Sequence, residues 1–147
     1  MSAAASPAIV DIRRTIAAPP AVLFAAWLDA ASVGRWMRPG ATTHTVATSD
    51  PREGGAFHYA MHTPGGVVEH TGKFVVIEPH TRLVFTWNSP HAGNQDSLVT
   101  VTFTPKGKAT EVAIHHEKLP LDKVAAHTGG WTDALAGLDA FAAAEAA

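Results

Sequence analysis

The sequence contains no cysteine. This absence excludes disulfide bonds, thiol nucleophiles and metal sites built on thiolates. It is consistent with a reducing compartment, and we expect the protein to be cytoplasmic. The first ten residues, MSAAASPAIV, lack a basic segment followed by an apolar run. We therefore expect no secretory signal peptide.

The sequence also lacks a large excess of positive or negative charge. The 147 residues carry 11 Lys and Arg against 13 Asp and Glu, a formal net charge of −2 at pH 7. The densest cationic segment is the pair Arg13–Arg14, which is too little for a nucleic-acid surface. No apolar run approaches the roughly 20 residues that a membrane-spanning helix needs. We expect neither nucleic acid nor membrane insertion.

The length and the hydrophobic fraction of 46% are typical of one globular domain. We expect this domain to span residues 8–145. Residues 1–7, which are rich in Ala and Ser, are expected to form a flexible tail.

Apolar periodicity predicts a strand, two short helices, about six strands and a long helix, in that order. The β-branched segment 8–16 is typical of a strand, and Pro19 and Pro20 suit the first turn of a helix. The later strands are predicted at 42–49, 56–62, 67–77, 82–87, 98–104 and 111–117. Their short, Gly- and Pro-rich connections favour hairpins. The pattern predicts an α+β fold, in which helices cover one face of an antiparallel sheet.

Alternation within the strands identifies the residues expected on the inner face of the sheet. The terminal helix adds an apolar stripe, with His127 one turn before it. These residues are either an ordinary core or the walls of an apolar cavity with a few polar groups. The predicted set is Phe57, Tyr59, Met61, Leu83, Phe85, Trp87, Val99, Val101, Phe103, Val112, Ile114, His116, Trp131, Leu135, Leu138 and Phe141.

Gly129 and Gly130 stand side by side near the start of this helix. Each glycine costs a helix about 1 kcal/mol relative to alanine. They either keep a cavity mouth open or admit the short helices, or they mark only an irregular start or kink of the helix. The sequence leaves both interpretations open.

The nine histidines do not predict a metal site. His58 and His62 lie four residues apart on a predicted strand, which separates them by about 13 Å at 3.3 Å per residue. His115 and His116 are neighbours and point to opposite faces. No nucleophile motif is present. Only His116 and His127 are weak candidates for acid–base chemistry, because a buried histidine can titrate near neutrality.

Five segments occur in an order that resembles a known family. They are AAPPAVLFAAWLDAASVGRWM, EGGAFHYAMHTPGG, HTGKFVVIEPHTRLVFTW, SLVTVTFTP and GGWTDALAGLDAF. The chain resembles stand-alone proteins related to the C-terminal domain of the heat-shock-protein-90 ATPase activator, within the START-like, Bet v 1-like (SRPBCC) superfamily. The resemblance runs from about Val10 to Phe141.

The resemblance implies a helix-grip fold, in which a curved antiparallel sheet of six to seven strands surrounds a long C-terminal helix. It also implies binding of a small hydrophobic molecule between sheet and helix, without a cofactor. Alternatives are a cyclase-like or hydrolase-like enzyme using the same pocket, or an interaction subunit without ligand. A homodimer stays open, supported either by exposed aromatics such as Trp36 or by the sheet edge near the segment TPGG. Trp36 is expected at the pocket mouth, and Tyr59, His116 and His127 are expected to orient the ligand. The expected ligand-binding residues are Trp36, Phe57, Tyr59, Met61, Phe85, Trp87, Phe103, His116, His127, Trp131 and Leu135.

Overall fold

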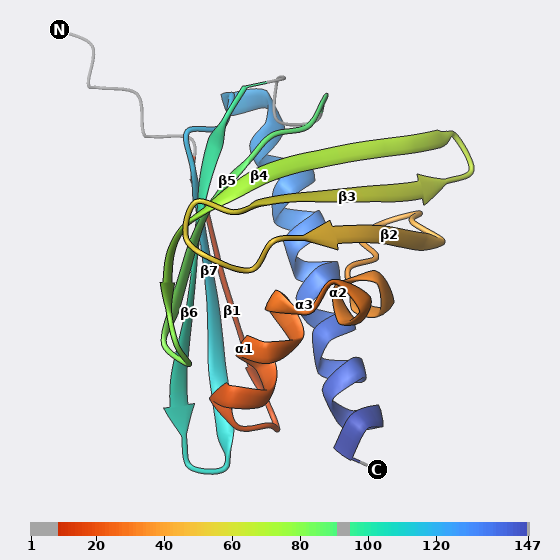
Figure 1. Cartoon of the computed structure of the whole chain (residues 1–147). Coiled ribbons are helices and arrows are strands. Elements are labelled where there is room, and N and C mark those ends of the chain that lie inside the picture. Colours follow the sequence, from red (N-terminus) through yellow and green to blue (C-terminus); the bar gives the residue numbers. More distant parts are fainter. Residues whose placement is uncertain (1–8, 91–94, 147) are drawn as a thin grey trace, which may run out of the picture.

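A computed structural model describes residues 9–90 and 95–146 of the chain (Figure 1). The predicted tail, residues 1–7, lies outside the described residues. The elements follow the predicted order. They are β1 (Val10–Ile16), α1 (Pro20–Leu28), α2 (Ala30–Trp36), β2 (His44–Ser49), β3 (Ala56–Thr63), β4 (Gly66–Glu78), β5 (Arg82–Trp87), β6 (Ser97–Lys106), β7 (Ala109–Glu117), the 3-10 helix η2 (Leu121–Lys123) and α3 (Val124–Ala146).

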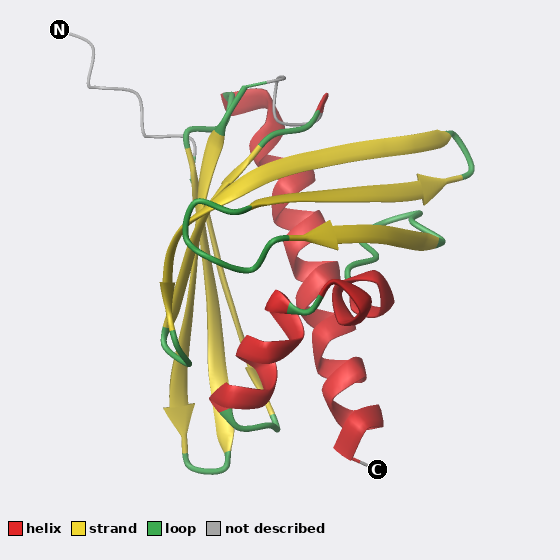
Figure 2. Cartoon of the chain, in the orientation of Figure 1, coloured by secondary structure: helices red, strands yellow, loops and turns green. Residues whose placement is uncertain are grey.

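The strands form one antiparallel sheet of seven, in the order β1-β7-β6-β5-β4-β3-β2. The sheet is strongly curved, so that β2, β3 and the start of β4 turn away from the direction of β6 and β7 (Figure 2). A register shift between Phe74 and Val76 interrupts the pairing of β4 with β5, and such bulges bend a sheet. Helix α3 crosses the concave face. The predicted helix-grip fold is confirmed.

The predicted inner face is also confirmed. The alternating residues of β3, β5, β6 and β7 are buried, including His116, which has a relative exposure of 0%. On α3, Trp131, Leu135 and Leu138 are buried, and Phe141 packs against the core while remaining partly exposed. Period-two alternation finds these positions because one face of each strand points toward α3.

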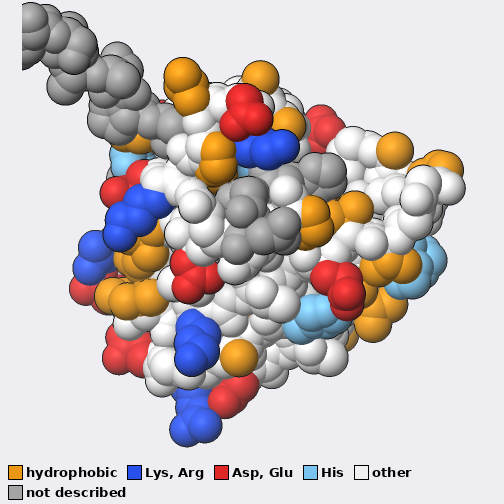
Figure 3. All heavy atoms as spheres, turned by 90° about the horizontal axis from the view of Figure 1, so that it is seen from above, with side chains coloured by type: hydrophobic (Ala, Val, Ile, Leu, Met, Phe, Trp, Pro, Cys, Tyr) orange, Lys and Arg blue, Asp and Glu red, His pale blue; other side chains and the backbone are white. Residues whose placement is uncertain are grey.

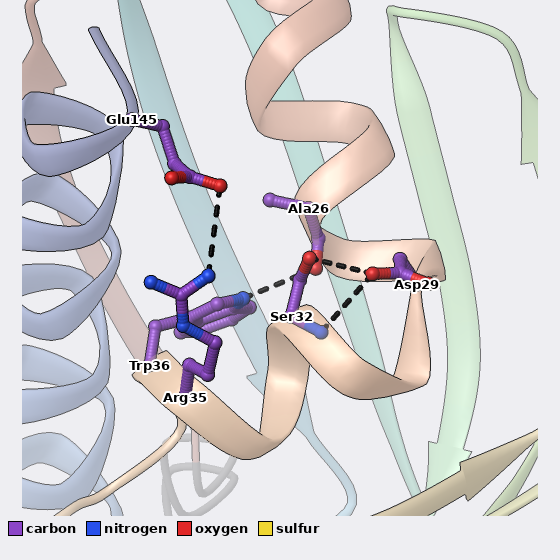
Figure 4. Close-up of polar contacts among 6 residues, drawn as sticks. All are labelled: Ala26, Asp29, Ser32, Arg35, Trp36 and Glu145. Carbon is purple, nitrogen blue, oxygen red and sulfur yellow. Dashed lines mark hydrogen bonds and ion pairs between the residues drawn. The ribbon is translucent and has the colours of Figure 1, made fainter. Parts of the chain in front are cut away.

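Helices α1 and α2 pack against the lower part of the groove between the sheet and α3 (Figure 1). Pro20 occupies the first turn of α1, as predicted, and Asp29 caps α2 by accepting from the Ser32 N–H at 3.1 Å. Figure 4 shows this cap together with Trp36, whose Nε1 donates to the carbonyl of Ala26 at 3.1 Å. Trp36 is therefore fixed inside the protein.

Helix α3 is continuous through Gly129 and Gly130, so these glycines do not mark a break. The short helices approach α3 elsewhere, where the carbonyl oxygen of Trp36 touches the position that a Cβ of Gly137 would occupy. Nearer the end of α3, Arg14 of β1 forms an ion pair with Asp139 at 2.9 Å. Arg35 of α2 forms another with Glu145 at 3.6 Å (Figure 4).

The surface seen from above carries Lys and Arg side chains interspersed with Asp and Glu (Figure 3). Individual hydrophobic side chains lie between them. Across the helices that the structure describes, none is both long enough and apolar enough to cross a membrane.

Candidate functional site

A pocket of about 430 Å³ lies beside the first half of α3. Its other sides are the connection between α2 and β2, the adjoining ends of β3 and β4, and the end of β5. Most of its lining is apolar. The polar side chains in the lining are Thr42, Thr63, His70, His127 and Asp133.

Two tryptophans form an aromatic wall of the pocket. The rings of Trp87 and Trp131 lie 5.0 Å apart between centroids, and the His70 ring lies 4.9 Å from that of Trp87. Met37 and Met61 add thioether side chains to the lining. Aromatic rings and methionine sulfur contact flat apolar molecules well.

Gly129 and Gly130 face the pocket from α3. A Cβ at Gly129 would meet no atom within 4 Å, and one at Gly130 would only reach the Cβ of Pro39 at 3.8 Å. The missing side chains therefore leave open space beside the pocket. Of the two interpretations of this pair, the structure supports an open pocket wall. The close approach of the short helices occurs instead at Gly137.

Asp133 fixes the distance between α3 and the connection that follows α2. Its Oδ2 accepts a hydrogen bond from the Gly40 N–H at 2.9 Å. Gly40 has a φ of 58°, and Thr42 N–H donates to the Pro39 carbonyl at 3.1 Å, so the connection forms a tight turn. The carboxylate thus holds this side of the pocket in place.

A chain of hydrogen bonds runs behind the aromatic wall. Trp131 Nε1 donates to His116 Nδ1 at 2.9 Å, so this ring nitrogen is the acceptor. His116 Nε2 therefore carries the proton of the neutral ring and donates to Ser97 Oγ at 2.6 Å. Ser97 Oγ in turn donates to the Trp87 carbonyl at 2.6 Å. The chain links the two tryptophans through one histidine tautomer.

The neutral form of His116 is strongly favoured. Burial, together with the nearby His127 and His115, lowers its pKa to about 3. A charged imidazole would lose its hydration and could not accept from Trp131. The ring of His127 lies 5.1 Å from that of His116, and its Nδ1 lies 2.9 Å from the Lys123 carbonyl, to which it donates.

Trp87 has a buried indole N–H for which the described part of the chain supplies no acceptor. Its side chain is 3% exposed, and Nε1 is buried without a hydrogen-bond partner among the described residues. An unsatisfied buried donor costs about 1–3 kcal/mol. By contrast, the indole N–H groups of Trp36 and Trp131 both donate to protein acceptors.

Four of the eleven residues predicted for the ligand site line this pocket, and seven do not. The four are Met61, Trp87, His127 and Trp131. The other seven are buried in the core, each with a relative exposure of 3% or less. They are Trp36, Phe57, Tyr59, Phe85, Phe103, His116 and Leu135.

Phe85 and Phe103 lie outside the pocket because Trp27 of α1 packs against them, with ring centroids 6.2 and 6.4 Å apart. Trp27 also packs against Trp131, at 6.3 Å between centroids. The groove between sheet and helix is filled at this end. Among the described residues, the pocket lies at the other end, near the start of α3.

The placement of Trp36 corrects two expectations. It does not stand at the pocket mouth, and with a relative exposure of 1% it offers no surface for a homodimer. Its ring packs against Trp27, with centroids 4.8 Å apart, while its N–H is held by Ala26. The two expected polar groups Tyr59 and His116 also lie outside the lining. Burial raises the pKa of Tyr59.

Sequence reasoning missed His70, Asp133 and the connection after α2. His70 is 7% exposed and pairs in register with Tyr59 of β3, so it shares the inner face. Its position opposite Tyr59 and four residues before buried Phe74 was the available signal. Asp133 gives no such signal, because its role depends on a backbone N–H that is 93 residues away in the sequence.

The remaining histidines considered for a metal are dispersed. His58 Nε2 lies 2.9 Å from Glu69 Oε1, and the His62 ring stacks on that of His44 at 4.1 Å between centroids. Within residues 9–90 and 95–146, no three His, Asp or Glu side chains gather in a way that could hold a metal ion.

Comparison with solved structures shows the same fold in other chains. CV1439 from Chromobacterium violaceum is 24% identical, covers 91% of this chain and 96% of that one, and has a TM-score of 0.77. CalU16 from Micromonospora echinospora is 26% identical, covers 93% and 77%, and has a TM-score of 0.71. DynU16, a protein in the dynemicin biosynthetic locus, is 19% identical, covers 90% and 46%, and has a TM-score of 0.75.

No curated protein is significantly similar to the chain in sequence. A family described as Activator of Hsp90 ATPase homolog 1-like protein matches residues 17–143. This range includes strands β2 to β7, helices α1 and α2, all but the last turn of α3, and the whole pocket lining, while β1 lies just before it. The resemblance in the sequence segments and the helix-grip fold agree with this match. The chain therefore belongs to the family of Activator of Hsp90 ATPase homolog 1-like proteins.

Proposed function

We propose that this protein binds a small, largely apolar molecule in the pocket between α3, the connection after α2 and the β3–β4 hairpin. The observation that carries the proposal is an apolar space of about 430 Å³ next to Gly129 and Gly130. Small-molecule sites in proteins have volumes of about 300–1,000 Å³, with apolar walls and a few polar groups. Both features are present here.

The construction of the walls supports the proposal. Asp133 holds Gly40 and so fixes one wall, and the His116–Ser97 chain connects Trp131 with Trp87 in the other. Both ring nitrogens of His116 are engaged within the protein. We therefore propose a positioning role for this residue, in which it orients Trp131 toward the ligand. The same fold in DynU16, a protein in the dynemicin biosynthetic locus, supports testing products of biosynthetic loci as ligands.

Replacing Gly129 by leucine is expected to weaken ligand binding while keeping the fold. The new side chain can enter the open space beside the pocket, since no atom lies within 4 Å of the Cβ position. We expect the affinity for a bound apolar compound to fall at least about tenfold, because the side chain competes for the same volume. Isothermal titration calorimetry with the best compound from a panel of steroids, lipids and polycyclic aromatics measures this change.

Ala140→Leu is the matched control. Ala140 is exposed on the same helix and does not line the pocket. The variant gains a leucine side chain as Gly129→Leu does, but outside the pocket. The affinity of Ala140→Leu for the compound should therefore equal that of the wild type. Equal affinity of Gly129→Leu and wild type would place the binding site elsewhere. Failure of the wild type to bind or be stabilised by any compound would contradict the proposed function.

A further inference from the structure

The charge of the pocket lining comes from Asp133. Among the described lining residues there is no lysine or arginine, and Asp133 is the only one with a carboxylate. The cationic residues nearest to the lining in sequence do not belong to it. Arg38 donates to the Gly34 carbonyl at 3.5 Å, and Lys123 lies outside the lining. With its histidines neutral, the pocket therefore presents a negative charge to a ligand.

The carboxylate of Asp133 is accessible and has room for a further donor. Asp133 is exposed, and because its backbone lies within α3, the exposed part is mainly the side chain. Its Oδ2 accepts from the Gly40 N–H, which uses one of about four acceptor positions of a carboxylate. Among the described residues Asp133 forms no ion pair, in contrast to Asp139, which pairs with Arg14 at 2.9 Å.

The glycine pair leaves this carboxylate uncovered. Side chains on a helix lean toward its N-terminus, so the side chain of Asp133 lies over the preceding turn. Gly129 and Gly130 stand in that turn, four and three residues earlier. Neither has a side chain that could cover the carboxylate, and no atom lies within 4 Å of a Cβ position at Gly129. The open space of the pocket therefore adjoins the charged group.

The N-terminus of α3 does not reverse the preference for a cation. A helix N-terminus carries about half a positive charge, and its effect falls off within the first turn. Helix α3 begins at Val124, so Asp133 lies in its third turn. An anionic ligand would lose hydration near Asp133 without gaining a guanidinium or ammonium partner. A cationic group would gain a partner of opposite charge.

We propose that the pocket selects a protonated amine with a largely apolar body, whose ammonium group pairs with the carboxylate of Asp133. The apolar body then lies against the lining beside Gly129 and Gly130. This inference rests on the proposed function, because it names the ligand class of the same pocket. Asp133 is a specificity-determining residue in addition to holding Gly40.

The test uses three probes that share one naphthalene ring system and differ in charge. They are 1-naphthylmethylamine, which is protonated at neutral pH, the neutral 1-naphthalenemethanol, and the anion 1-naphthoate. We expect the wild type at low salt to bind the amine about fivefold more tightly than the alcohol, because an ion pair that water still reaches contributes modestly. The naphthoate should bind most weakly. Isothermal titration calorimetry gives the three affinities.

Two variants test the assignment to Asp133. Asp133→Asn removes the charge and keeps a side-chain oxygen that can accept from the Gly40 N–H, so the preference for the amine over the alcohol should disappear. Asp122→Asn is the matched control, because Asp122 is exposed just before α3 and lies outside the pocket lining. This variant loses the same charge and should keep the preference.

A measurement on the wild type alone covers the case in which Asp133→Asn does not fold. Raising the ionic strength from about 0.01 M to about 1 M shortens the screening length from about 30 Å to about 3 Å. The ratio of the amine affinity to the alcohol affinity should fall toward one, while the alcohol affinity should not fall. A preference for the amine that salt leaves unchanged would contradict an ion pair with an exposed carboxylate.

The outcomes separate the inference from the proposed function. Equal or tighter binding of the alcohol by the wild type would overturn the inference while leaving an apolar binding pocket. A preference for the amine that survives in Asp133→Asn, or that is lost equally in Asp122→Asn, would overturn the assignment to Asp133. Binding of none of the three probes would also overturn the inference, and the panel of steroids, lipids and polycyclic aromatics then decides the proposed function separately.

Discussion

Replacing Gly137 by alanine is expected to destabilise the protein by about 1–3 kcal/mol, although alanine is the better helix former. A Cβ at this position would overlap the backbone carbonyl oxygen of Trp36. The carbonyl cannot rotate away as a side chain could. Helix α2 or α3 would have to move, and both pack on the core around Trp27.

The same substitution at Gly129 is expected to have the opposite effect. Gly129→Ala should stabilise the protein by about 0.5–1 kcal/mol, because the helix gains propensity and the new methyl group meets no atom within 4 Å. Urea unfolding of the two variants and the wild type, followed by circular dichroism, measures both changes. Both glycines lie on α3, so the gain in helix propensity is similar in the two variants. The difference between their free energies of unfolding then reports on packing.

A destabilised Gly129→Ala or a stabilised Gly137→Ala would contradict the described packing of α3. The expected pair of results would also explain why an alanine-rich helix contains these glycines. Gly137 permits close approach of α2. Gly129 and Gly130 leave space for a ligand and cost the protein some stability in its absence.

Replacing His116 by glutamine is expected to flatten the pH dependence of stability in the acidic range. His116 is neutral in the folded protein, since burial lowers its pKa to about 3, whereas an unfolded histidine has a pKa of about 6.5. As the pH falls below about 6.5, the unfolded chain binds a proton that the folded chain does not. The free energy of unfolding therefore falls over this range, and the loss ends only near the folded pKa.

We expect this single group to lower the free energy of unfolding of the wild type by about 2 kcal/mol between pH 8 and pH 5. His116→Gln lacks the titrating ring and should lose about that much less over the same range. It should also be less stable at pH 8 by about 1–3 kcal/mol, since Trp131 Nε1 loses its acceptor. Chemical unfolding at several pH values measures both effects.

His115→Gln is the matched control on the same strand. His115 lies on the opposite face of β7 and is partly exposed, so this variant should keep the steep pH dependence of the wild type. Parallel curves for wild type and His116→Gln would show that His116 is not held neutral. The described hydrogen-bond chain between the tryptophans would then be wrong.

The sequence predicted the fold well because its signals are local. Alternation in segments such as 56–62 and 111–117 marks the buried face directly, and Pro20 marks the start of α1. Short turns imply antiparallel neighbours, so the sheet order from β2 to β7 follows from the order of these strands in the chain. The place of β1 beside β7 does not follow in this way. The ordered family segments add the curvature and the position of the terminal helix.

The position of the pocket could not be predicted in the same way. Phe85 and Trp87 are two residues apart on one face of β5, yet only Trp87 lines the pocket, because Trp27 of α1 packs against Phe85. How far α1 reaches into the groove depends on contacts among residues far apart in sequence. The hydrogen bond between Gly40 and Asp133 is of the same kind.

The location of ligand binding in the pocket is the central claim. Backbone ¹H–¹⁵N spectra, recorded with increasing amounts of the tightest-binding compound from the panel of steroids, lipids and polycyclic aromatics, test it most directly. The glycine amides of Gly40, Gly129 and Gly130 report on the pocket, and those of Gly54 and Gly107 serve as internal controls outside its lining. The account predicts progressive shifts of the first three signals and unchanged positions of the last two. Unchanged signals from Gly129 and Gly130, with shifts elsewhere or with none at all, would contradict it.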